Sequence, residues 1–183
     1  TSYVFATPFA KQCADSLEFG VGTLALTFTD NVYIFGGMNV INQAGNTAVQ
    51  RYVGKGVFKL GLKSSCLFSK QTLSTLGQTT EQSELGRSAD TSTIDISFLH
   101  NEPILFVEIS YVNVYIGTRT RVFTTISSST NSITGPTTPT DNPYWKQITL
   151  STSVIDDIRA TQYHLIISSN SNVIVFGRNS NGR

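Results

Sequence analysis

The sequence contains few of the side chains that carry charge, metal or redox chemistry. Of its 183 residues, 14% are charged, and it has two cysteines, two histidines and one tryptophan. An average soluble domain has about 25% charged residues, so solubility here depends on neutral polar groups. The formal net charge is +1, and neither sign of charge forms a block. An electrostatic nucleic-acid binder carries a basic stripe and a large positive total, so nucleic acid is not expected as a partner.

Signals for membranes and secretion are also missing. No run of about 18 apolar residues occurs, so no membrane span is predicted. The chain starts at Thr1 without a signal peptide and has no Asn-x-Ser/Thr acceptor, which favours a processed or excised intracellular chain, in cytoplasm, cytoskeleton or nucleus. Cys13 and Cys66 are too few for a disulfide-dense scaffold. Two half-buried thiols are the preferred interpretation, and one disulfide is the alternative.

The abundant residues favour β-strands. Serine and threonine together number 45, and there are 11 phenylalanines and 7 tyrosines. Threonine, β-branched and aromatic side chains suit a pleated surface. The composition therefore predicts an all-β domain, and the length is that of one domain able to bury a core.

Two segments far apart in the sequence are similar to each other without a gap. Residues 17–36 read LEFGVGTLALTFTDNVYIFG, and residues 158–177 read IRATQYHLIISSNSNVIVFG. Each has an apolar strand, a polar turn and a second strand ending in Phe-Gly, which predicts a β-hairpin. Residues 98–117, FLHNEPILFVEISYVNVYIG, form a degenerate third copy in which Ile116 replaces the phenylalanine.

The closing glycines of these copies divide the chain unevenly. Gly36, Gly117 and Gly177 lie 81 and then 60 residues apart. The spacing assigns the 21 extra residues to the first interval, where a polar surface loop is predicted at 69–93. A second loop, rich in Ser, Thr, Pro and Gly, is predicted at 124–140.

A hairpin cannot bury both of its faces alone, so the repeated units must pack against one another. Residues 32–35 and 173–176 are continuously apolar. Such strands are expected to be covered on both faces, as they are between neighbouring blades of a β-propeller.

The residues after the closing glycines resemble the repeat of the RCC1 (regulator of chromosome condensation) family. That repeat continues Gly-x-Asn-x-x-Gly-Gln-Leu-Gly after its second strand. The middle copy departs from this pattern after its closing glycine, and Arg183 stands where the family usually has Gln. The matching residues are Asn179 and Gly182 in the last copy and, after one extra residue, Asn39, Gln43 and Gly45 in the first.

The resemblance implies an RCC1-like β-propeller fragment of about three blades, and a jelly-roll or β-sandwich is the alternative. It implies a single domain, residues 1–183, that is part of a larger propeller. Further blades, from the same polypeptide or another chain, are expected to cover the strand edges that a partial propeller exposes. The repeat cores are 17–45, 98–121 and 158–183, and the structural repeat glycines are Gly36, Gly117, Gly177 and Gly182.

The sequence shows no catalytic or metal-binding constellation. His100 and His164 have no partners at metal-ligand spacing. For His164, the resemblance to the RCC1 repeat, which often has a structural His before its first apolar strand, implies a structural hydrogen bond. No Gly-x-Ser-x-Gly occurs, and the glycine clusters do not match a phosphate-binding loop. We therefore expect no enzymatic activity, no cofactor and no metal site.

Function is expected to reside in the loops of the propeller. The resemblance implies a non-enzymatic protein-interaction or structural scaffold, with guanine-nucleotide exchange on a small GTPase as an alternative. An exposed acidic patch would favour exchange, and residues 81–84 are the candidate. A β-sandwich shell or a carbohydrate-binding protein is the third hypothesis. The candidate partner-contact residues are Glu81, Glu84, Arg87, Arg119 and Arg121.

Overall fold

The structure is a computed structural model, and the part of the chain it describes consists of short β-strands and two turns of 3-10 helix. Among these residues, no helix is long and apolar enough to cross a membrane. Outside the described residues lie Cys13, Glu81, Gly182 and the repeat tails 37–45 and 178–183. In the strands before residue 56, only the side chain of Leu17 is described. The described residues are 16–20, 23–28, 31–36, 50–53, 56–61, 64–77, 82–88, 93–128, 133, 135–151, 154–170 and 172–177.

The described strands form four antiparallel sheets. Sheet 1 contains β1 (Ser16–Gly20), β2 (Thr23–Phe28), β3 (Asn31–Gly36) and β4 (Gln50–Val53). Sheet 2 contains β5 (Val57–Leu60), β6 (Ser64–Phe68) and β7 (Leu73–Gly77). Sheet 3 has the order β11-β12-β10-β9-β8, with β8 (Phe106–Ile109), β9 (Val114–Gly117), β10 (Val122–Thr125), β11 (Thr137–Pro139) and β12 (Trp145–Ile148). Sheet 4 contains β13 (Asp157–Ala160), β14 (His164–Ser169) and β15 (Asn172–Gly177).

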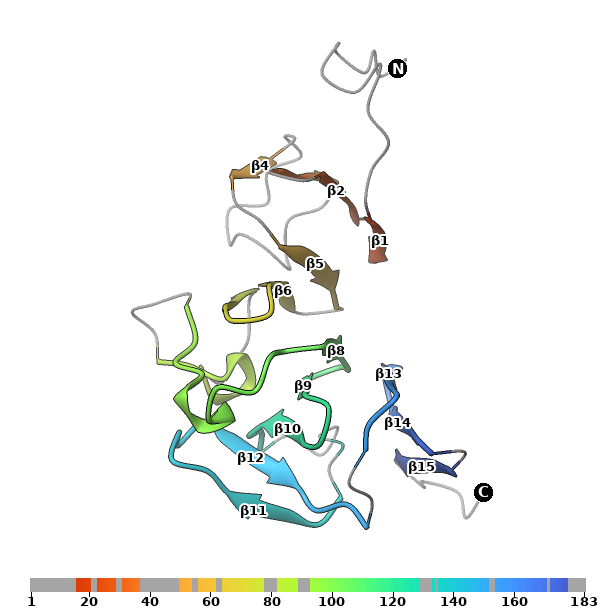
Figure 1. Cartoon of the computed structure of the whole chain (residues 1–183). Helices are drawn as coiled ribbons and strands as arrows, with labels where there is room; N and C mark the ends of the chain where they lie inside the picture. Colours follow the sequence, from red (N-terminus) through yellow and green to blue (C-terminus); the bar gives the residue numbers. More distant parts are fainter. Residues whose placement is uncertain are drawn as a thin grey trace.

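The four sheets radiate from an arc formed by their first strands. β1 contacts β5, β5 contacts β8, and β8 contacts β13, while the remaining strands extend outward (Figure 1). Radial repetition of antiparallel sheets is the architecture of a β-propeller. The all-β propeller prediction is confirmed, with four sheets described where about three blades were expected. A jelly-roll or β-sandwich is wrong, because those folds place two sheets face to face.

Each sheet has two faces that differ in what covers them. We define the leading face of a sheet as the face that carries the charged residue of its first strand. Its central row is Lys59, Cys66 and Thr75 in sheet 2, Glu108, Tyr115 and Thr124 in sheet 3, and Arg159, Ile166 and Val175 in sheet 4. The opposite face is the trailing face, because side chains alternate along a strand.

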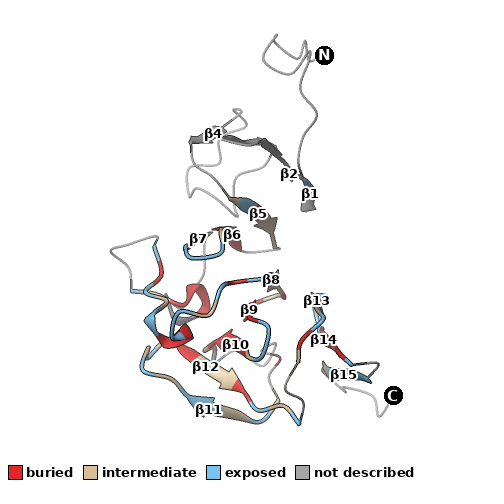
Figure 2. Cartoon of the chain, in the orientation of Figure 1, coloured by how far each residue is buried: buried red, intermediate tan, exposed pale blue. Residues whose placement is uncertain are grey.

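The hydrophobic core lies between the leading face of one sheet and the trailing face of the next. Between sheets 2 and 3, Cys66, Phe68 and Leu73 belong to one buried cluster with Val107, Ile116 and Phe123. Between sheets 3 and 4, Tyr115 and Val122 belong to another with Ile158, Leu165 and Ile167. Figure 2 shows this burial concentrated in sheet 3. The stacking of blades, and not the interior of any one sheet, therefore forms the core.

The middle repeat copy, 98–121, was assigned to the wrong strands of its sheet: its hairpin was matched to second and third strands. Its predicted hairpin exists as β8 and β9, but β8 is the first strand of its sheet. Gly117 therefore ends a second strand, whereas Gly36 and Gly177 end third strands. Adjacent antiparallel strands have the same local pattern, so a hairpin motif does not reveal its place in the sheet.

Sheet 2 is the copy that the sequence comparison missed. Gly77 ends its third strand and pairs with Ser64, as Gly36 pairs with Thr23 and Gly177 with His164. Gly77 lies 41 residues after Gly36, so the first interval contains a complete sheet and not a long loop.

Both predicted loops contain strands. β7 lies within 69–93, together with the 3-10 turn η2 (Gln82–Leu85). The range 124–140 begins inside β10 and includes β11. Polar composition was misleading because the buried hydroxyls are hydrogen-bonded: Thr75 Oγ1 donates to the Leu85 carbonyl at 2.7 Å, and Thr125 Oγ1 accepts from the Val114 amide at 3.0 Å.

Two further expectations concern buried residues. Cys66 is a free cysteine that is fully buried in sheet 2, and burial raises the pKa of its thiol.

Residues 173–176 were expected to be covered on both faces. That is wrong for sheet 4, because Val173 and Val175 are exposed on its leading face.

Candidate interaction site

The acidic segment predicted to meet a partner does not present an exposed pair of carboxylates. Glu84 belongs to η2 and is 3% exposed, and its Oε1 accepts a hydrogen bond of 2.8 Å from Ser127 Oγ. Its Oε2 is buried without a hydrogen-bond partner. Glu84 therefore connects η2 to the end of β10 and does not face a partner.

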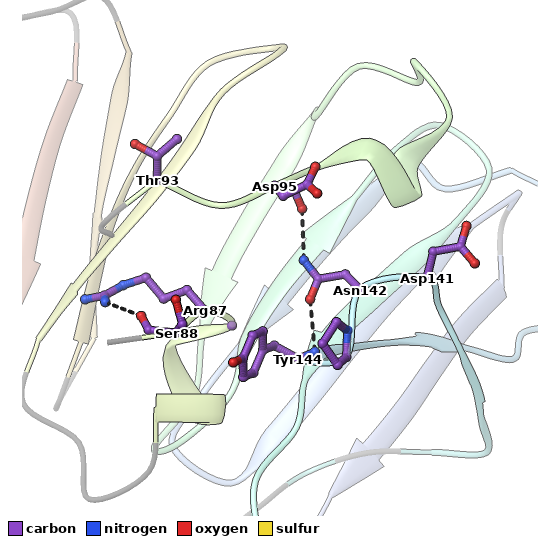
Figure 3. Close-up of a pocket in the computed structure, with 9 residues that line it drawn as sticks. Arg87, Ser88, Thr93, Asp95, Asp141, Asn142 and Tyr144 are labelled. Carbon is purple, nitrogen blue, oxygen red and sulfur yellow. Dashed lines mark hydrogen bonds between the residues drawn. The ribbon is translucent and has the colours of Figure 1, made fainter. Parts of the chain in front are cut away.

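A polar hollow lies beside sheet 3, at the end where β12 begins. It has a volume of about 250 Å³, and its lining residues come from the β7–β8 connection and from the turn before β12 (Figure 3). The 3-10 turn η3 (Ser97–Leu99) follows Asp95 in that connection. The lining residues are Gly86, Arg87, Ser88, Thr93, Asp95, Asp141, Asn142, Pro143 and Tyr144.

Asn142 joins the two sides of the hollow. Its Nδ2 donates to the Asp95 carbonyl at 3.0 Å, and its Oδ1 accepts from the Tyr144 amide at 3.0 Å. Figure 3 shows the Asn142 side chain between these two residues. One side chain thus fixes the spacing of segments 47 positions apart in the sequence.

The predicted contact residue Arg87 lies on the wall of the hollow. Its Nε donates to the carbonyl and hydroxyl oxygens of Thr75, at 3.3 and 3.2 Å, and its Nη1 donates to the Ser88 carbonyl at 2.9 Å. Burial lowers the pKa of Arg87. Its guanidinium is therefore directed toward its own backbone neighbours.

Two carboxylates also line the hollow. Asp95 Oδ1 accepts from the Ser97 amide at 3.0 Å, and the Asp141 side chain is 90% exposed, 4.0 Å from His100 Nε2. Carboxylates that project toward solvent can receive a cationic side chain. The hollow therefore suits a lysine or arginine of a partner better than an anion.

The two predicted arginine contacts have different environments. Arg121 is mostly buried: its Nε donates to Glu102 Oε1 at 2.9 Å, its Nη2 donates to the Leu99 carbonyl, and its guanidinium lies 5.2 Å from the Phe123 ring centroid. Arg119 is 60% exposed, and its Nη1 lies 3.5 Å from Asp156 Oδ1. Of these two, Arg119 is the one accessible to a partner.

Glu102 shows how strongly the Arg121 cluster is bonded. Burial by itself would raise the pKa of Glu102, but hydrogen bonds from Thr118, Thr120 and Arg121, and the charge of Arg121, outweigh it. The pKa of Glu102 therefore lies below its ordinary value. Arg121 is a structural residue in this fold.

A second group of charges, which the sequence analysis missed, lies along the arc of first strands. Lys59 Nζ in β5 is 3.2 Å from Glu108 Oε1 in β8, and Arg159 Nη1 in β13 is 3.5 Å from the same oxygen. Burial raises the pKa of Glu108, against the opposite effects of Lys59, Arg159 and a backbone hydrogen bond from Ala160. We call Lys59, Glu108 and Arg159 the inner-strand charges.

A sequence signal for these charges exists. Each lies between apolar residues in a first strand, as in Phe58-Lys59-Leu60 and Ile158-Arg159-Ala160. An alignment of first strands would have found them. The repeat comparison instead matched β8 and β9 to second and third strands, so Glu108 was not aligned with Arg159.

Within the described residues, no group of three or more His, Cys, Asp or Glu side chains could hold a metal ion. The absence of a cofactor stays a prediction from the sequence. The stronger features of this surface are the polar hollow and the inner-strand charges.

The sequence matches no family model, and no curated protein is significantly similar to it. Its structure is similar to that of human WBSCR16, with a TM-score of 0.66 and 15% identity over 87% of this chain and 47% of that one. It is also similar to yeast RCC1 (Prp20) bound to Kap60, with a TM-score of 0.65 and 11% identity over 92% of this chain and 44% of that one.

A further similar structure is Prp20p from Saccharomyces cerevisiae, solved in a study of its binding to Gsp1p and histones. The TM-score is 0.63 at 15% identity, over 91% of this chain and 44% of that one. The chain thus spans about half the length of the solved proteins that it matches. Together with the radial sheets, these similarities show the fold.

Proposed function

Since the chain has the fold of an RCC1-like β-propeller, we propose that it is a non-catalytic protein-interaction scaffold that binds a basic segment of a partner in the polar hollow. The observation that carries this proposal is the pair of carboxylates, Asp95 and Asp141, on the lining of a hollow of about 250 Å³. The one arginine of the lining, Arg87, donates hydrogen bonds to Thr75 and Ser88 on the wall of the hollow.

The structural neighbours support protein partners of this kind. Prp20p was studied for binding to Gsp1p and histones, and RCC1 was solved bound to Kap60. Histones are basic proteins, and basic side chains complement the two carboxylates of the hollow. At 11–15% identity the neighbours share the fold with this chain, so the partner class is our proposal.

The test is binding of a lysine- and arginine-rich peptide of histone-tail composition, followed by fluorescence anisotropy. Replacing both carboxylates, in Asp95→Asn/Asp141→Asn, is expected to weaken binding about tenfold, because each exposed ion pair contributes up to about 1 kcal/mol. Asp156→Asn/Asp157→Asn, which removes two carboxylates at the start of sheet 4, is the charge-matched control and should bind like the parent. Equal binding by the parent and the double variant, or no binding by either, would refute the proposal.

Nucleotide exchange on a small GTPase stays a second hypothesis that rests on the family resemblance. Glu84, one of the two acidic residues of the segment expected to favour it, is buried, and Glu81 lies outside the described residues. A nucleotide-release assay with a panel of small GTPases tests it, and release at the uncatalysed rate throughout would rule it out.

We also propose that further blades cover the outer sheets, from the same polypeptide or from another chain. The exposed valines of β15 support this, because a covered blade buries the corresponding residues. An intracellular location is part of the same proposal.

A further inference from the structure

The polar hollow has the size of a site for one side chain of a partner. Its volume is about 250 Å³, whereas pockets that enclose drug-sized molecules usually measure about 300–1,000 Å³. Its lining combines carboxylates and hydroxyls with one aromatic ring, that of Tyr144. An occupant that complements this lining therefore needs a positive charge and a flat face that can lie against a ring.

Hydrogen bonds within the protein hold the sides of the hollow in place. Trp145 Nε1, in β12, donates to the Gly86 carbonyl at 2.9 Å. Asn142 Nδ2 donates to the Asp95 carbonyl at 3.0 Å, and Asp95 Oδ1 accepts from the Ser97 amide at 3.0 Å. Because the lining is fixed by these bonds, little further ordering is needed when a partner binds, which lowers the free-energy cost of association.

Tyr144 packs against the core and also lines the hollow. Its amide donates to Asn142 Oδ1 at 3.0 Å, and its side chain is half-buried against the buried cluster that includes Trp145. Figure 3 shows the Tyr144 ring below Asn142, with the carboxylates of Asp95 and Asp141 above it. The core thus supports the ring, while the hollow gives a partner access to it.

The two carboxylates of the lining are accessible to a cation. The Asp141 side chain is 90% exposed, and it lies 4.0 Å from the ring of His100, which is 68% exposed. A pair of exposed groups contributes little stability, so a partner cation can replace this contact. Asp95 is also exposed, and its Oδ1 accepts from the Ser97 amide. A carboxylate has about four acceptor positions, so this bond leaves Asp95 able to form an ion pair.

Arginine meets these requirements better than lysine does. Its guanidinium is planar, so it stacks on an aromatic ring and donates a fork of N–H groups to a carboxylate at the same time. It is also more weakly hydrated than an ammonium group, so its removal from water costs less. The compact ammonium of lysine gains mainly from the carboxylates. Tyr144 is therefore expected to add more affinity for arginine than for lysine.

From these observations we propose that the polar hollow is an arginine-selective site, in which one guanidinium of the partner stacks on Tyr144 and pairs with a carboxylate of the lining. This inference rests on the proposed function, because it names the side chain of the basic partner that enters the hollow. Tyr144 is the residue that determines specificity. Asn142 is a positioning residue, because it joins the backbone of Tyr144 to that of Asp95.

The first experiment compares two peptides that are identical except that every basic residue is arginine in one and lysine in the other. Fluorescence anisotropy at one ionic strength should show that the arginine peptide binds about two- to fivefold more tightly. Equal affinities, both weakened by Asp95→Asn/Asp141→Asn, would overturn the selectivity and leave the proposed function intact. Binding of neither peptide would overturn both.

The second experiment tests whether Tyr144 is the source of the preference. Tyr144→Leu keeps an apolar side chain against the core but removes the ring, so the arginine peptide should bind it only as tightly as the lysine peptide does. Tyr144→Phe keeps the ring and should keep the preference. Tyr163→Leu is the control, because it removes a 38% exposed ring from the β13–β14 turn. Thermal unfolding establishes that each variant is folded, and a full preference in folded Tyr144→Leu would contradict the proposal.

A third measurement detects the stacking in the unaltered protein. Protons held over the face of an aromatic ring resonate upfield, so the δ-methylene protons of an arginine in the peptide should shift upfield when the peptide binds. The shift should persist with Tyr163→Leu and disappear with Tyr144→Leu. If no arginine of the peptide shifts upfield in the saturated complex, no guanidinium is stacked on Tyr144 and the proposal is wrong.

Discussion

Sheets 3 and 4 are both antiparallel sheets whose first strand lies on the arc, yet the exposure of their leading faces is opposite to what side-chain polarity suggests. In sheet 3, the hydroxyl-bearing Tyr115 and Thr124 are fully buried. In sheet 4, the apolar Val173 and Val175 are exposed. The difference shows that burial in this fold depends on whether a neighbouring sheet covers the strand, and not on the hydropathy of the strand itself.

The covered face tolerates polar groups because their hydrogen bonds are made inside the protein. Tyr115 Oη donates to the Ile133 carbonyl at 2.8 Å and lies 3.3 Å from Ser110 Oγ. Burial raises the pKa of Tyr115, so the phenol stays neutral. Thr124 Oγ1 donates to the Thr125 carbonyl at 3.2 Å. Paired in this way, the hydroxyls avoid the cost of burying a polar group without a partner.

The largest loss of stability is expected when Tyr115, the buried aromatic residue on the leading face of sheet 3, is truncated. Tyr115→Ala leaves a cavity between sheets 3 and 4 and an unpaired Ile133 carbonyl, so the free energy of unfolding should fall by about 3–5 kcal/mol. Val175→Ala, on the exposed leading face of sheet 4, should change the free energy of unfolding by less than about 0.5 kcal/mol. Urea unfolding followed by circular dichroism measures both.

The order of these two effects is the test. A loss at Val175 as large as the loss at Tyr115 would show that the leading face of sheet 4 is already covered in solution.

Substitution of the closing glycines is expected to reduce stability by an intermediate amount. A Cβ on Gly117 would lie 2.3 Å from Ile158 Cδ1 and 2.9 Å from Phe106 Cδ2, inside the contact between sheets 3 and 4. Gly117→Ala should therefore cost about 1–3 kcal/mol by overpacking. At Gly177 the nearest atom is His164 Cδ2 at 2.3 Å, which belongs to an exposed ring able to turn away.

Gly177→Ala should consequently cost less than Gly117→Ala, and His164→Ala combined with it should recover most of the loss. Thermal unfolding of the three variants gives the comparison. If the double variant is no more stable than Gly177→Ala alone, contact with the His164 ring is not the reason for glycine at this position.

The sequence was sufficient for features that depend on neighbouring residues. The β2–β3 and β14–β15 hairpins follow from an apolar strand, a polar turn and a second strand, and both exist. The place of β8–β9 in its sheet was not predictable in this way, because every antiparallel pair has that pattern. Sheet 2 was missed because its buried row includes Cys66 and Thr75, whose burial depends on the facing sheet.

The candidate site depends on contacts that no local pattern contains. The hollow joins Arg87 and Asp95 of the β7–β8 connection to Asn142 of the turn before β12, and Asp95 and Asn142 are 47 positions apart in the sequence. The burial of Glu84 has the same cause, because Ser127 comes from the end of another strand. The inner-strand charges, in contrast, recur at matching register positions, so they were accessible to a search that begins from first strands.

The smallest expected effect concerns Glu108, which connects the covered face of sheet 3 to the open face of sheet 4. Burial raises its pKa, so the folded state binds this proton more tightly than the unfolded state. The stabilisation is complete below the ordinary glutamate value of about 4.3 and is lost as the pH rises through the raised pKa. Glu102, with its lowered pKa, has the opposite dependence and loses its contribution as the pH falls.

Carbon-13 NMR of the side-chain carboxyls should accordingly show Glu102 titrating at lower pH than Glu108. Arg159→Gln removes one of the charges that oppose the effect of burial, so the pKa of Glu108 should rise further. Arg119→Gln, which removes a cation paired with Asp156 in place of Glu108, should leave it unchanged. A Glu108 titration that does not respond to Arg159→Gln would mean that the open face is electrostatically separate from the covered one, and the interaction between sheets 3 and 4 would then rest on apolar packing alone.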